Sequence, residues 1–319
     1  MDGTMTRTYR TIEVPVAGGD LHVGVWDAAG EADAPTVLLV HGVTSSHLAW
    51  QFLADALPHV RLVAPDLRGR GRSNAVEGPA GMAVHADDLA AVCAHLGLPP
   101  VLVVGHSMGA FVAVAFADRH PDAVTSLLLV DGGLPLAAPA GLDPEELVAA
   151  ILGPTAERLS MRFRDVDAYL AFWRRHAAFR EAWSPQLERY LAYDLVPDGD
   201  GLRPATSYRT TVDDTVDLTT GSTVPDALAA LRRPALLITV PRGLQDEPPG
   251  LYPLDHLADA LSRVPSVEHR RYESYNHYTI VMSEQGAAAL ALVVAELAAS
   301  APVAVDTLAA EAAAGGSLA

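Results

Sequence analysis

A serine at position 107 lies where a buried-strand pattern passes into a helix pattern, the arrangement in which proteins display a nucleophilic hydroxyl. The apolar run Val101–Gly105 predicts the strand, and Met108–His120 predicts the helix that follows it. Gly105 and Gly109 surround the serine in a Gly-x-Ser-x-Gly pattern, and without side chains they let strand and helix approach closely. We therefore expect Ser107 to stand exposed at the carboxyl end of a sheet and to act as a nucleophile.

A neutral serine hydroxyl is a weak nucleophile and needs a neighbouring base. All 22 basic residues of the chain are arginine, so no lysine can serve and the base must be one of the 12 histidines. His277 lies in the loop Ser274–Ile280, after the last predicted strand, and this loop emerges at the same sheet edge as Ser107. We predict His277 as the base. Histidines within predicted helices or strands are better explained as surface or packing residues: His95, His120, His176, His256 and His269.

The base in turn needs a carboxylate that fixes its tautomer. Asp131 directly follows the predicted strand Ser126–Val130, and Asp246 lies in the loop after Ala235–Val240. Both positions are at the carboxyl edge of the sheet. The strand order and the spacing from Gly243 favour Asp246 as the acid, with Asp131 as the alternative.

An acyl-transfer site also needs donors for a developing oxyanion. The first backbone N–H of the helix after the serine belongs to Met108, and a second candidate is the N–H of Val43, which follows Gly42 at the end of a strand. His41, at the same strand end, is predicted to make a structural hydrogen bond rather than to act as a base. The segment Asp66–Ser73 is predicted to form a turn held by pairs between Asp66 and the arginines.

The elements that must position these residues follow an alternating pattern. Eight predicted strands span Thr11–Val16, Leu21–Trp26, Thr36–Val40, Arg61–Ala64, Val101–Gly105, Ser126–Val130, Ala235–Val240 and Val267–Glu273. Helices are predicted at His47–Leu57, Met82–Leu96, Met108–His120 and Leu254–Val264. Helices between strands imply right-handed crossovers, and therefore a mostly parallel eight-stranded sheet with helices on both faces. Ala17–Asp20 is a hairpin signal that adds an antiparallel edge.

The regular alternation of predicted strands and helices stops after residue 133 and resumes near residue 224. We predict an α/β core over residues 1–133 and 224–300, an inserted helical cap over 134–223, and a flexible tail over 301–319. Cap helices are predicted at Pro144–Leu152, Asp165–His176, Pro185–Asp194 and Thr210–Leu218. Because pockets lie between such modules, the cap and the catalytic loops should line the substrate site. The predicted substrate-binding residues are Thr44, His106, Phe172, Trp173, Arg242 and Tyr278.

Composition narrows the classes of function. A net charge of −17 disfavours nucleic acid as a partner. The single cysteine, Cys93, allows neither an internal disulfide nor a cysteine-based zinc site, and it is predicted to be a small core residue. We find no apolar run of membrane-spanning length and no apolar export segment, so we expect a cytoplasmic protein without membrane association.

Five motifs in this order resemble the α/β-hydrolase superfamily: His41-Gly42, Asp66-Leu-Arg-Gly-x-Gly-x-Ser73, Gly105-His-Ser-Met-Gly109, Gly243-x-x-Asp246 and the late His277. The resemblance covers nearly all of residues 10–300 and implies the capped fold with a Ser-Asp-His order. Serine at the turn argues against epoxide hydrolases and haloalkane dehalogenases, which resemble this pattern but use aspartate there. The segment Asn276–Thr279 is loosely similar to hydrolases of monoalkyl phthalate half-esters.

The residues and the resemblance together predict a carboxylic ester hydrolase that acts through an acyl-enzyme on a small or medium, mainly apolar ester, with an aromatic half-ester as one option. An anionic half-ester would require a local cation, for which the candidates are Arg162, Arg164, Arg174, Arg175 and Arg242. No metal or organic cofactor is expected. The alternatives that share these motifs are a cofactor-free haloperoxidase or perhydrolase, a C–C bond hydrolase and a non-catalytic ligand-binding homologue.

Overall fold

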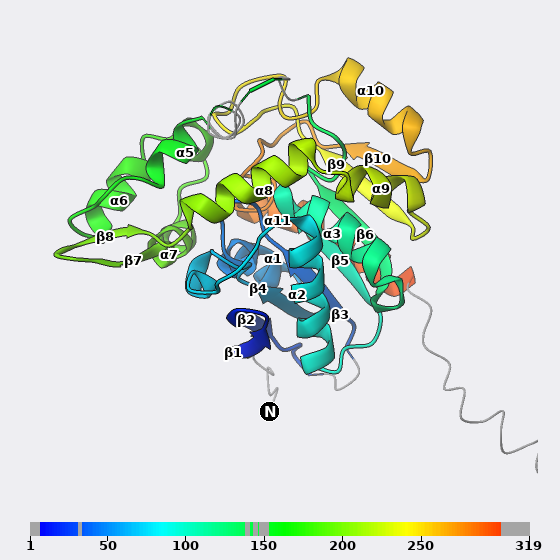
Figure 1. Cartoon of the computed structure of the whole chain (residues 1–319), viewed down its shortest axis with the longest axis horizontal. Coiled ribbons are helices and arrows are strands. Elements are labelled where there is room, and N and C mark those ends of the chain that lie inside the picture. Colours follow the sequence, from blue (N-terminus) through cyan, green and yellow to red (C-terminus); the bar gives the residue numbers. More distant parts are fainter. Residues whose placement is uncertain (1–6, 31–33, 138–140, 143–145, 147–152, 301–319) are drawn as a thin grey trace, which may run out of the picture.

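A computed structural model describes residues 7–30, 34–137, 141–142, 146 and 153–300. Its centre is an eight-stranded sheet in the order β1-β2-β4-β3-β5-β6-β9-β10 (Figure 1). The strands are β1 (Tyr9–Val16), β2 (Gly19–Trp26), β3 (Thr36–Val40), β4 (Arg61–Pro65), β5 (Val101–His106), β6 (Val124–Val130), β9 (Ala235–Thr239) and β10 (Val267–Arg271). Each overlaps one of the eight predicted segments, although β9 and β10 end one and two residues earlier than predicted, so the predicted sheet is confirmed.

The two ends of the sheet differ in direction. β1 and β2 form an antiparallel hairpin, and β2 pairs antiparallel with β4. All other neighbouring pairs are parallel, from β4 through to β10. The antiparallel edge predicted from the turn at Ala17–Asp20 is therefore present.

Helices cover both faces of the sheet (Figure 1). One face packs against α2 (Met82–His95), α3 (Met108–Arg119), α9 (Thr223–Ala230) and α10 (Leu254–Arg263). The other face packs against α1 (Gln51–Ala56) and α11 (Glu284–Ser300). Side chains along β3 alternate between the two faces of the sheet. Leu38 and Val40 belong to the hydrophobic core under α2 and α3, while Val37 and Leu39 belong to the core under α1 and α11. Short 3-10 helices lie at η1 (His47–Trp50), η2 (Gly71–Ser73) and η3 (Pro121–Ala123).

The segment between β6 and α9 contains most of the additional elements. They are α5 (Pro154–Arg158), α6 (Val166–Trp173), η4 (Ala177–Phe179), α7 (Pro185–Tyr193), β7 (Leu195–Asp198), β8 (Gly201–Pro204) and α8 (Tyr208–Thr220). Three predicted cap helices thus correspond to α6, α7 and α8. The predicted helix Pro144–Leu152 and the predicted tail 301–319 lie outside the described residues, apart from Glu146. The boundaries of the cap at 134 and 223 stay a prediction.

This segment, called the cap below, is not purely helical, although the sequence interpretation predicted helices alone. β7 and β8 form a two-stranded antiparallel hairpin, in which Asp198 pairs with Gly201 across a two-residue turn. Gly199 in this turn has a φ of +59°, a left-handed conformation that glycine adopts without strain. The Asp-Gly-Asp-Gly run at 198–201 is a hairpin signal that the predicted helical cap left out of account.

Candidate active site

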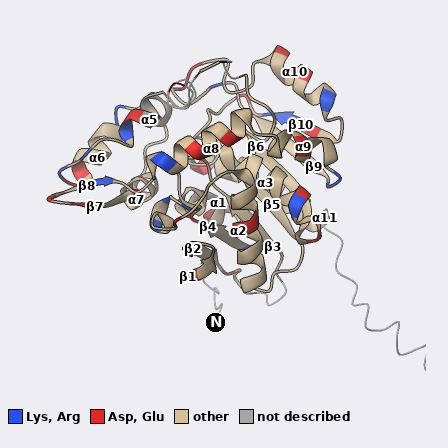
Figure 2. Cartoon of the chain, viewed as in Figure 1, with Lys and Arg blue, Asp and Glu red and all other residues tan. Residues whose placement is uncertain are grey.

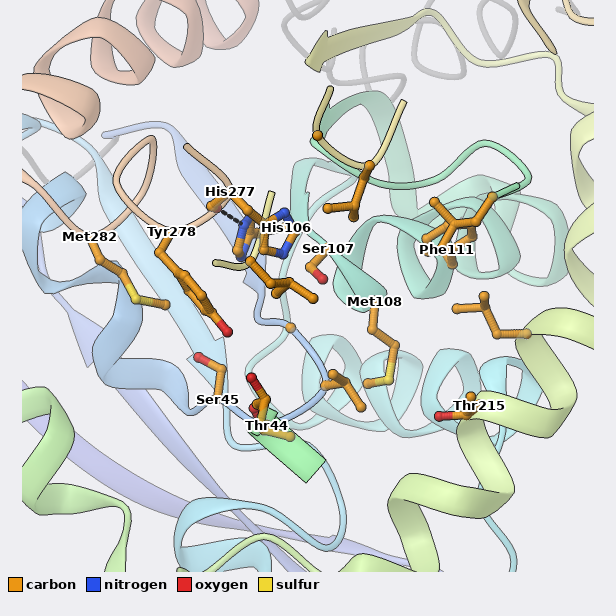
Figure 3. Close-up of a pocket in the computed structure, with 18 of the residues that line it drawn as sticks. Thr44, Ser45, His106, Ser107, Met108, Phe111, Thr215, His277, Tyr278 and Met282 are labelled. Carbon is orange, nitrogen blue, oxygen red and sulfur yellow. Dashed lines mark hydrogen bonds between the residues drawn. The ribbon is translucent and has the colours of Figure 1, made fainter. Parts of the chain in front are cut away.

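Ser107 stands at the tight turn between β5 and α3. Its φ of 55° and ψ of −126° place it in a strained conformation, as the motif predicted. The flanking glycines are required because a Cβ on Gly105 would lie 2.3 Å from the Gly109 carbonyl oxygen, and one on Gly109 would lie 2.1 Å from the Val40 carbonyl oxygen. Figure 3 shows the Ser107 hydroxyl pointing into a cavity, beside His277 and Met108.

His277 lies in the loop after β10 and is almost completely buried, with 2% exposed. Its Nδ1 lies 2.7 Å from Oδ2 of Asp131, which has no exposed surface. A carboxylate can only accept here, so Nδ1 carries the proton and Nε2 is left as the acceptor for a serine proton. The loop is fixed by further contacts: the His277 N–H donates to the Arg242 carbonyl at 2.9 Å, and His106 Nε2 donates to the His277 carbonyl at 2.8 Å.

The structure contradicts Asp246 as the partner of His277 and places the alternative, Asp131, there instead. Asp131 follows β6 directly, and its N–H donates to the Ile238 carbonyl at 2.7 Å, so the backbone aims its side chain at the histidine. Asp246 lies further along the loop after β9 and pairs with Arg242 at 3.2 Å. It also accepts a hydrogen bond from Asn276 at 2.9 Å, so it supports the loop that carries His277 without contacting the imidazole.

The two candidate oxyanion donors belong to Met108 and Val43. Met108 begins α3, where backbone N–H groups have no intrahelical acceptor, and Val43 follows β3. Both residues line the same cavity as Ser107. His41 has the structural role predicted for it: its Nδ1 donates to the Gly42 carbonyl at 2.8 Å, and its Nε2 accepts from the Leu67 N–H at 3.0 Å. Burial lowers the pKa of His41 to about 4, which keeps the imidazole neutral.

The predicted pairs between Asp66 and the arginines are wrong. Asp66 is fully buried, and its side chain accepts from His47 Nδ1 at 2.8 Å, from the Tyr193 hydroxyl at 2.6 Å and from the Arg72 backbone N–H at 2.8 Å. Burial opposes the charged carboxylate, but the neighbouring His47 outweighs it and holds the pKa of Asp66 below its usual range. The segment 66–73 is still a structural turn, joined to cap helix α7 through Tyr193.

A cavity of about 270 Å³ opens in front of Ser107, between the sheet edge and the cap (Figure 3). Its wall is mainly apolar and includes Phe111, Leu136, Leu218, Leu251 and Met282. Hydroxyl groups lie on part of the wall, where Ser45 Oγ is 2.9 Å from the Tyr190 hydroxyl. Burial raises the pKa of Tyr190 and of Tyr278, so both phenols stay neutral.

Four of the six predicted substrate-binding residues line this cavity: Thr44, His106, Trp173 and Tyr278. The other two do not. Phe172 packs against the rings of Phe163 and Trp173 within the cap, at centroid distances of 5.9 and 5.8 Å. Arg242 is turned toward Asp246 and the Ser274 carbonyl.

The arginines proposed to hold an anionic half-ester are also absent from the described lining of the cavity. Arg162 pairs with Asp198, Arg164 with Asp165, and Arg174 with Glu188. The charged residues that do line it are acidic, Asp214 and Glu247. The expectation of an arginine for a substrate carboxylate is therefore wrong for this cavity.

Sequence reasoning missed the contribution of helix α8. Asp214, Thr215 and Leu218 line the cavity, and none of them was singled out. The only available signal was their spacing on one predicted helix, which does not say what the helix packs against. Within the described ranges, no group of three or more histidine, cysteine, aspartate or glutamate side chains is placed to hold a metal ion.

Comparison with known proteins places this geometry in a family. Residues 35–193 match the family model described as the alpha/beta hydrolase fold. The thioesterase domain from the curacin biosynthetic pathway superimposes with a TM-score of 0.71 over 91% of this chain and 99% of that domain, at 23% identity. The chain belongs to the α/β-hydrolase superfamily.

Two relatives of this α/β hydrolase have assigned activities. Lipase LipV of Mycobacterium tuberculosis is 38% identical over 157 residues, which are 46% of this chain and 58% of the lipase. The bifunctional esterase/perhydrolase DCH of Acinetobacter calcoaceticus is 32% identical over 158 residues, or 47% of this chain and 56% of that enzyme. The matches therefore span little more than half the length of either relative.

No helix in the described part of this α/β hydrolase has the length and apolar content needed to cross a membrane.

Proposed function

We propose that this α/β hydrolase is a carboxylic ester hydrolase that acts on small or medium, uncharged and mainly apolar esters. The observation that carries the proposal is the 2.7 Å contact between His277 Nδ1 and Asp131 Oδ2, beside the strained Ser107 in one apolar cavity. Relatives named as a lipase and an esterase/perhydrolase support ester chemistry.

The proposed reaction has two half-reactions. Nε2 of His277 accepts the proton as Ser107 Oγ attacks the ester carbonyl carbon, and Asp131 stabilises the imidazolium that forms. The N–H groups of Val43 and Met108 stabilise the oxyanion. When the C–O bond breaks, the imidazolium gives its proton to the leaving alkoxide, and an acyl-enzyme remains on Ser107. Water then attacks the acyl-enzyme with the same base and releases the carboxylic acid.

The charge of the cavity favours neutral substrates over half-esters. Asp214 is paired with Arg70, but Glu247, an exposed carboxylate side chain, also lines the cavity and has no such arginine partner among the described ion pairs. A substrate carboxylate would be repelled there and would find no arginine in the described lining. We therefore propose neutral esters, rather than anionic half-esters, as the substrates.

The test is hydrolysis of a series of p-nitrophenyl esters by the wild-type protein and by Ser107→Ala. Loss of the nucleophile should lower turnover by about 10⁴–10⁶-fold without affecting the fold, because the hydroxyl supplies chemistry and little packing. A fluorophosphonate probe should label wild-type protein, and peptide mass spectrometry should locate the label on Ser107. Turnover by a folded Ser107→Ala protein within about tenfold of wild type would refute the mechanism.

A second candidate is perhydrolysis, which the similarity to the bifunctional esterase/perhydrolase DCH favours. In that reaction hydrogen peroxide replaces water at the acyl-enzyme, so that a peroxycarboxylic acid is released from Ser107. Assays of peracid formation with and without peroxide, at equal ester concentration, give the ratio of the two activities. Peracid production that exceeds hydrolysis would make the perhydrolase the principal function.

A further inference from the structure

Arg70 is a fully buried arginine that the proposed mechanism does not use. It lies in the turn before η2, and no part of it is exposed to solvent. Its Nη1 forms an ion pair with Oδ2 of Asp214 at 2.6 Å and donates to the Arg68 carbonyl at 2.9 Å. Its Nε donates to the Val43 carbonyl at 2.8 Å. A buried guanidinium is costly to desolvate, and here it is satisfied by one carboxylate and by two backbone carbonyls.

The contact with Val43 matters because Val43 carries a proposed oxyanion donor. The N–H of Val43 belongs to the same peptide group as the Gly42 carbonyl, and His41 Nδ1 fixes that group at 2.8 Å. The next peptide group contains the Val43 carbonyl, which Arg70 fixes. Both peptide groups that flank the Val43 Cα are therefore held. If either were released, rotation about the Val43 backbone bonds could turn its N–H away from the oxyanion.

Arg70 also reaches the second proposed donor residue. Its Nη2 lies 3.9 Å from Sδ of Met108, whose N–H begins α3. A thioether is only a weak acceptor, so this contact acts mainly through packing. Met108 is 4% exposed and lines the cavity. One guanidinium thus contacts both residues that carry a proposed oxyanion donor.

Asp214 connects Arg70 to the cap. It lies on α8, is fully buried, and its Oδ1 accepts from the Gly81 N–H at 2.7 Å and lies 3.0 Å from His85 Nε2. Burial opposes the charged form, but His85 and Arg70 lower the pKa of Asp214 to about 2. Figure 2 shows acidic positions along both α8 and α2, the two helices next to this turn. The neighbours of Asp214 on α8, Thr215 and Leu218, line the cavity.

We propose that Arg70 is a positioning residue for the oxyanion hole, and that its ion pair with Asp214 couples the Val43 loop to cap helix α8. The inference rests on the proposed ester hydrolysis through Ser107. It assigns a role to the first variable position of the Asp-Leu-Arg-Gly-x-Gly-x-Ser segment, which the sequence interpretation treated only as part of a turn. The position of α8 and the orientation of the Val43 N–H then depend on the same buried network of contacts.

The test removes both charges together, because deleting one partner would leave a buried charge unpaired. Arg70→Met with Asp214→Asn deletes the contact with the Val43 carbonyl. The matched control is Arg68→Met with Asp88→Asn, since this neighbouring pair is also buried, with Nε to Oδ2 and Nη2 to Oδ1 both at 2.8 Å. Arg68 donates to the carbonyls of Ala17, Glu77 and Pro79, none of which lines the cavity.

The expected result is a lower kcat with little change in KM. The Arg70 double variant should lose about 10- to 100-fold in kcat with KM changed less than about threefold, because a displaced donor acts in the transition state. Inhibition by a trifluoromethyl ketone, which forms an oxyanion on the serine, should weaken by the same factor as kcat. The Arg68 double variant should keep kcat and the inhibition constant within about threefold of wild type. Circular dichroism and thermal unfolding establish that each variant is folded.

A third variant, Arg70→Lys, separates the ion pair from the positioning contact. A lysine amine can pair with Asp214 but lacks the second donor group that reaches the Val43 carbonyl, so kcat should still fall. This variant decides the matter if the double variant does not fold. The inference is overturned if folded Arg70 variants keep kcat and inhibition within about threefold of wild type, or if the Arg68 control loses as much. Wild-type protein that hydrolyses no ester and takes up no fluorophosphonate would instead refute the proposed function, and the inference with it.

Discussion

Replacing Asp131 by asparagine should disable the site while leaving the fold intact. The φ of Asp131 is 46°, a left-handed conformation that asparagine tolerates, so the substitution adds no backbone strain. Its Oδ1 accepts from the Val240 N–H at 3.4 Å, and the amide oxygen of asparagine would take over this contact. The amide NH₂ would then face Nδ1 of His277. Two donors cannot face each other, so the imidazole proton would move to Nε2, the nitrogen that must accept from Ser107.

The magnitude follows from this loss of the correct tautomer. An asparagine in place of the triad carboxylate lowers kcat by about 10⁴-fold, equivalent to about 5.4 kcal/mol in the activation free energy. Asp246→Asn is the matched control, because its φ of 65° also suits asparagine. Asp246 has one partly exposed ion pair with Arg242 and one hydrogen bond with Asn276. These contacts are worth less than about 2 kcal/mol together and act on loop stability, so kcat should stay within about tenfold.

The assay is p-nitrophenyl ester hydrolysis by the three proteins at pH 8, with unfolding curves to show that each is folded. Active-site titration with a fluorophosphonate corrects for any inactive fraction. Equal losses in both variants, or a larger loss in Asp246→Asn, would refute the assignment of Asp131. The same is true if a folded Asp131→Asn protein keeps more than about a tenth of the wild-type kcat.

Three further predictions concern stability and substrate charge. Burial lowers the pKa of His41 from 6.5 to about 4, so between these pH values only the unfolded chain binds a proton at this residue. The free energy of unfolding should therefore fall as the pH drops from 6.5 to 4, and His41 should contribute up to about 1.4 kcal/mol per pH unit to this slope. His41→Gln should remove that contribution, which urea titrations at several pH values measure. An unchanged slope in the variant would contradict this. Gly109→Ala should lower the free energy of unfolding by about 3 kcal/mol or more, because its Cβ would lie 2.1 Å from the Val40 carbonyl oxygen. The control Gly97→Ala, whose Cβ would have nothing within 4 Å, should lower it by only about 1–2 kcal/mol, from its positive φ alone. Glu247→Gln should raise kcat/KM for an anionic half-ester by about two- to fivefold relative to the neutral diester, and equal effects on both substrates would show that this carboxylate does not act on the substrate.

The sheet and the nucleophile turn could be predicted because their causes are local in sequence. A strand buried on both faces, such as Val101–His106, reads as a continuous apolar run, and the Gly-x-Ser-x-Gly turn follows from steric limits within five residues. The loop of His277 could be placed because every parallel strand ends at the same edge. These features depend on order along the chain and on backbone geometry, and the structure contains both.

The contacts across the cavity could not be predicted in the same way. Asp214 lies 144 residues after Arg70 in the chain, and no local pattern in either segment shows that they form a buried pair. The arginines near Asp66 suggested ion pairs by proximity in sequence, but the carboxylate is satisfied by His47 and Tyr193. Likewise Phe172 and Trp173 are adjacent in sequence, yet only Trp173 faces the cavity, because the helix turns the two rings in different directions.

The choice between the two acids shows what sequence order leaves open and what geometry decides. Two neighbouring parallel strands, β6 and β9, each end near the histidine loop, so strand order alone admits a carboxylate from either. The electrostatic surroundings differ, however. Asp246 is already paired with a guanidinium and is 31% exposed at its side chain, so much of its charge is compensated before it could act on an imidazolium.

Asp131 is buried, has no arginine among its described ion pairs, and faces His277 directly. In a water-excluded position a carboxylate stabilises a neighbouring imidazolium far more than it would at the surface. The two acids therefore have different roles in the proposed reaction. There Asp131 would stabilise the imidazolium that forms, while Asp246, through Asn276, contacts the loop that carries His277.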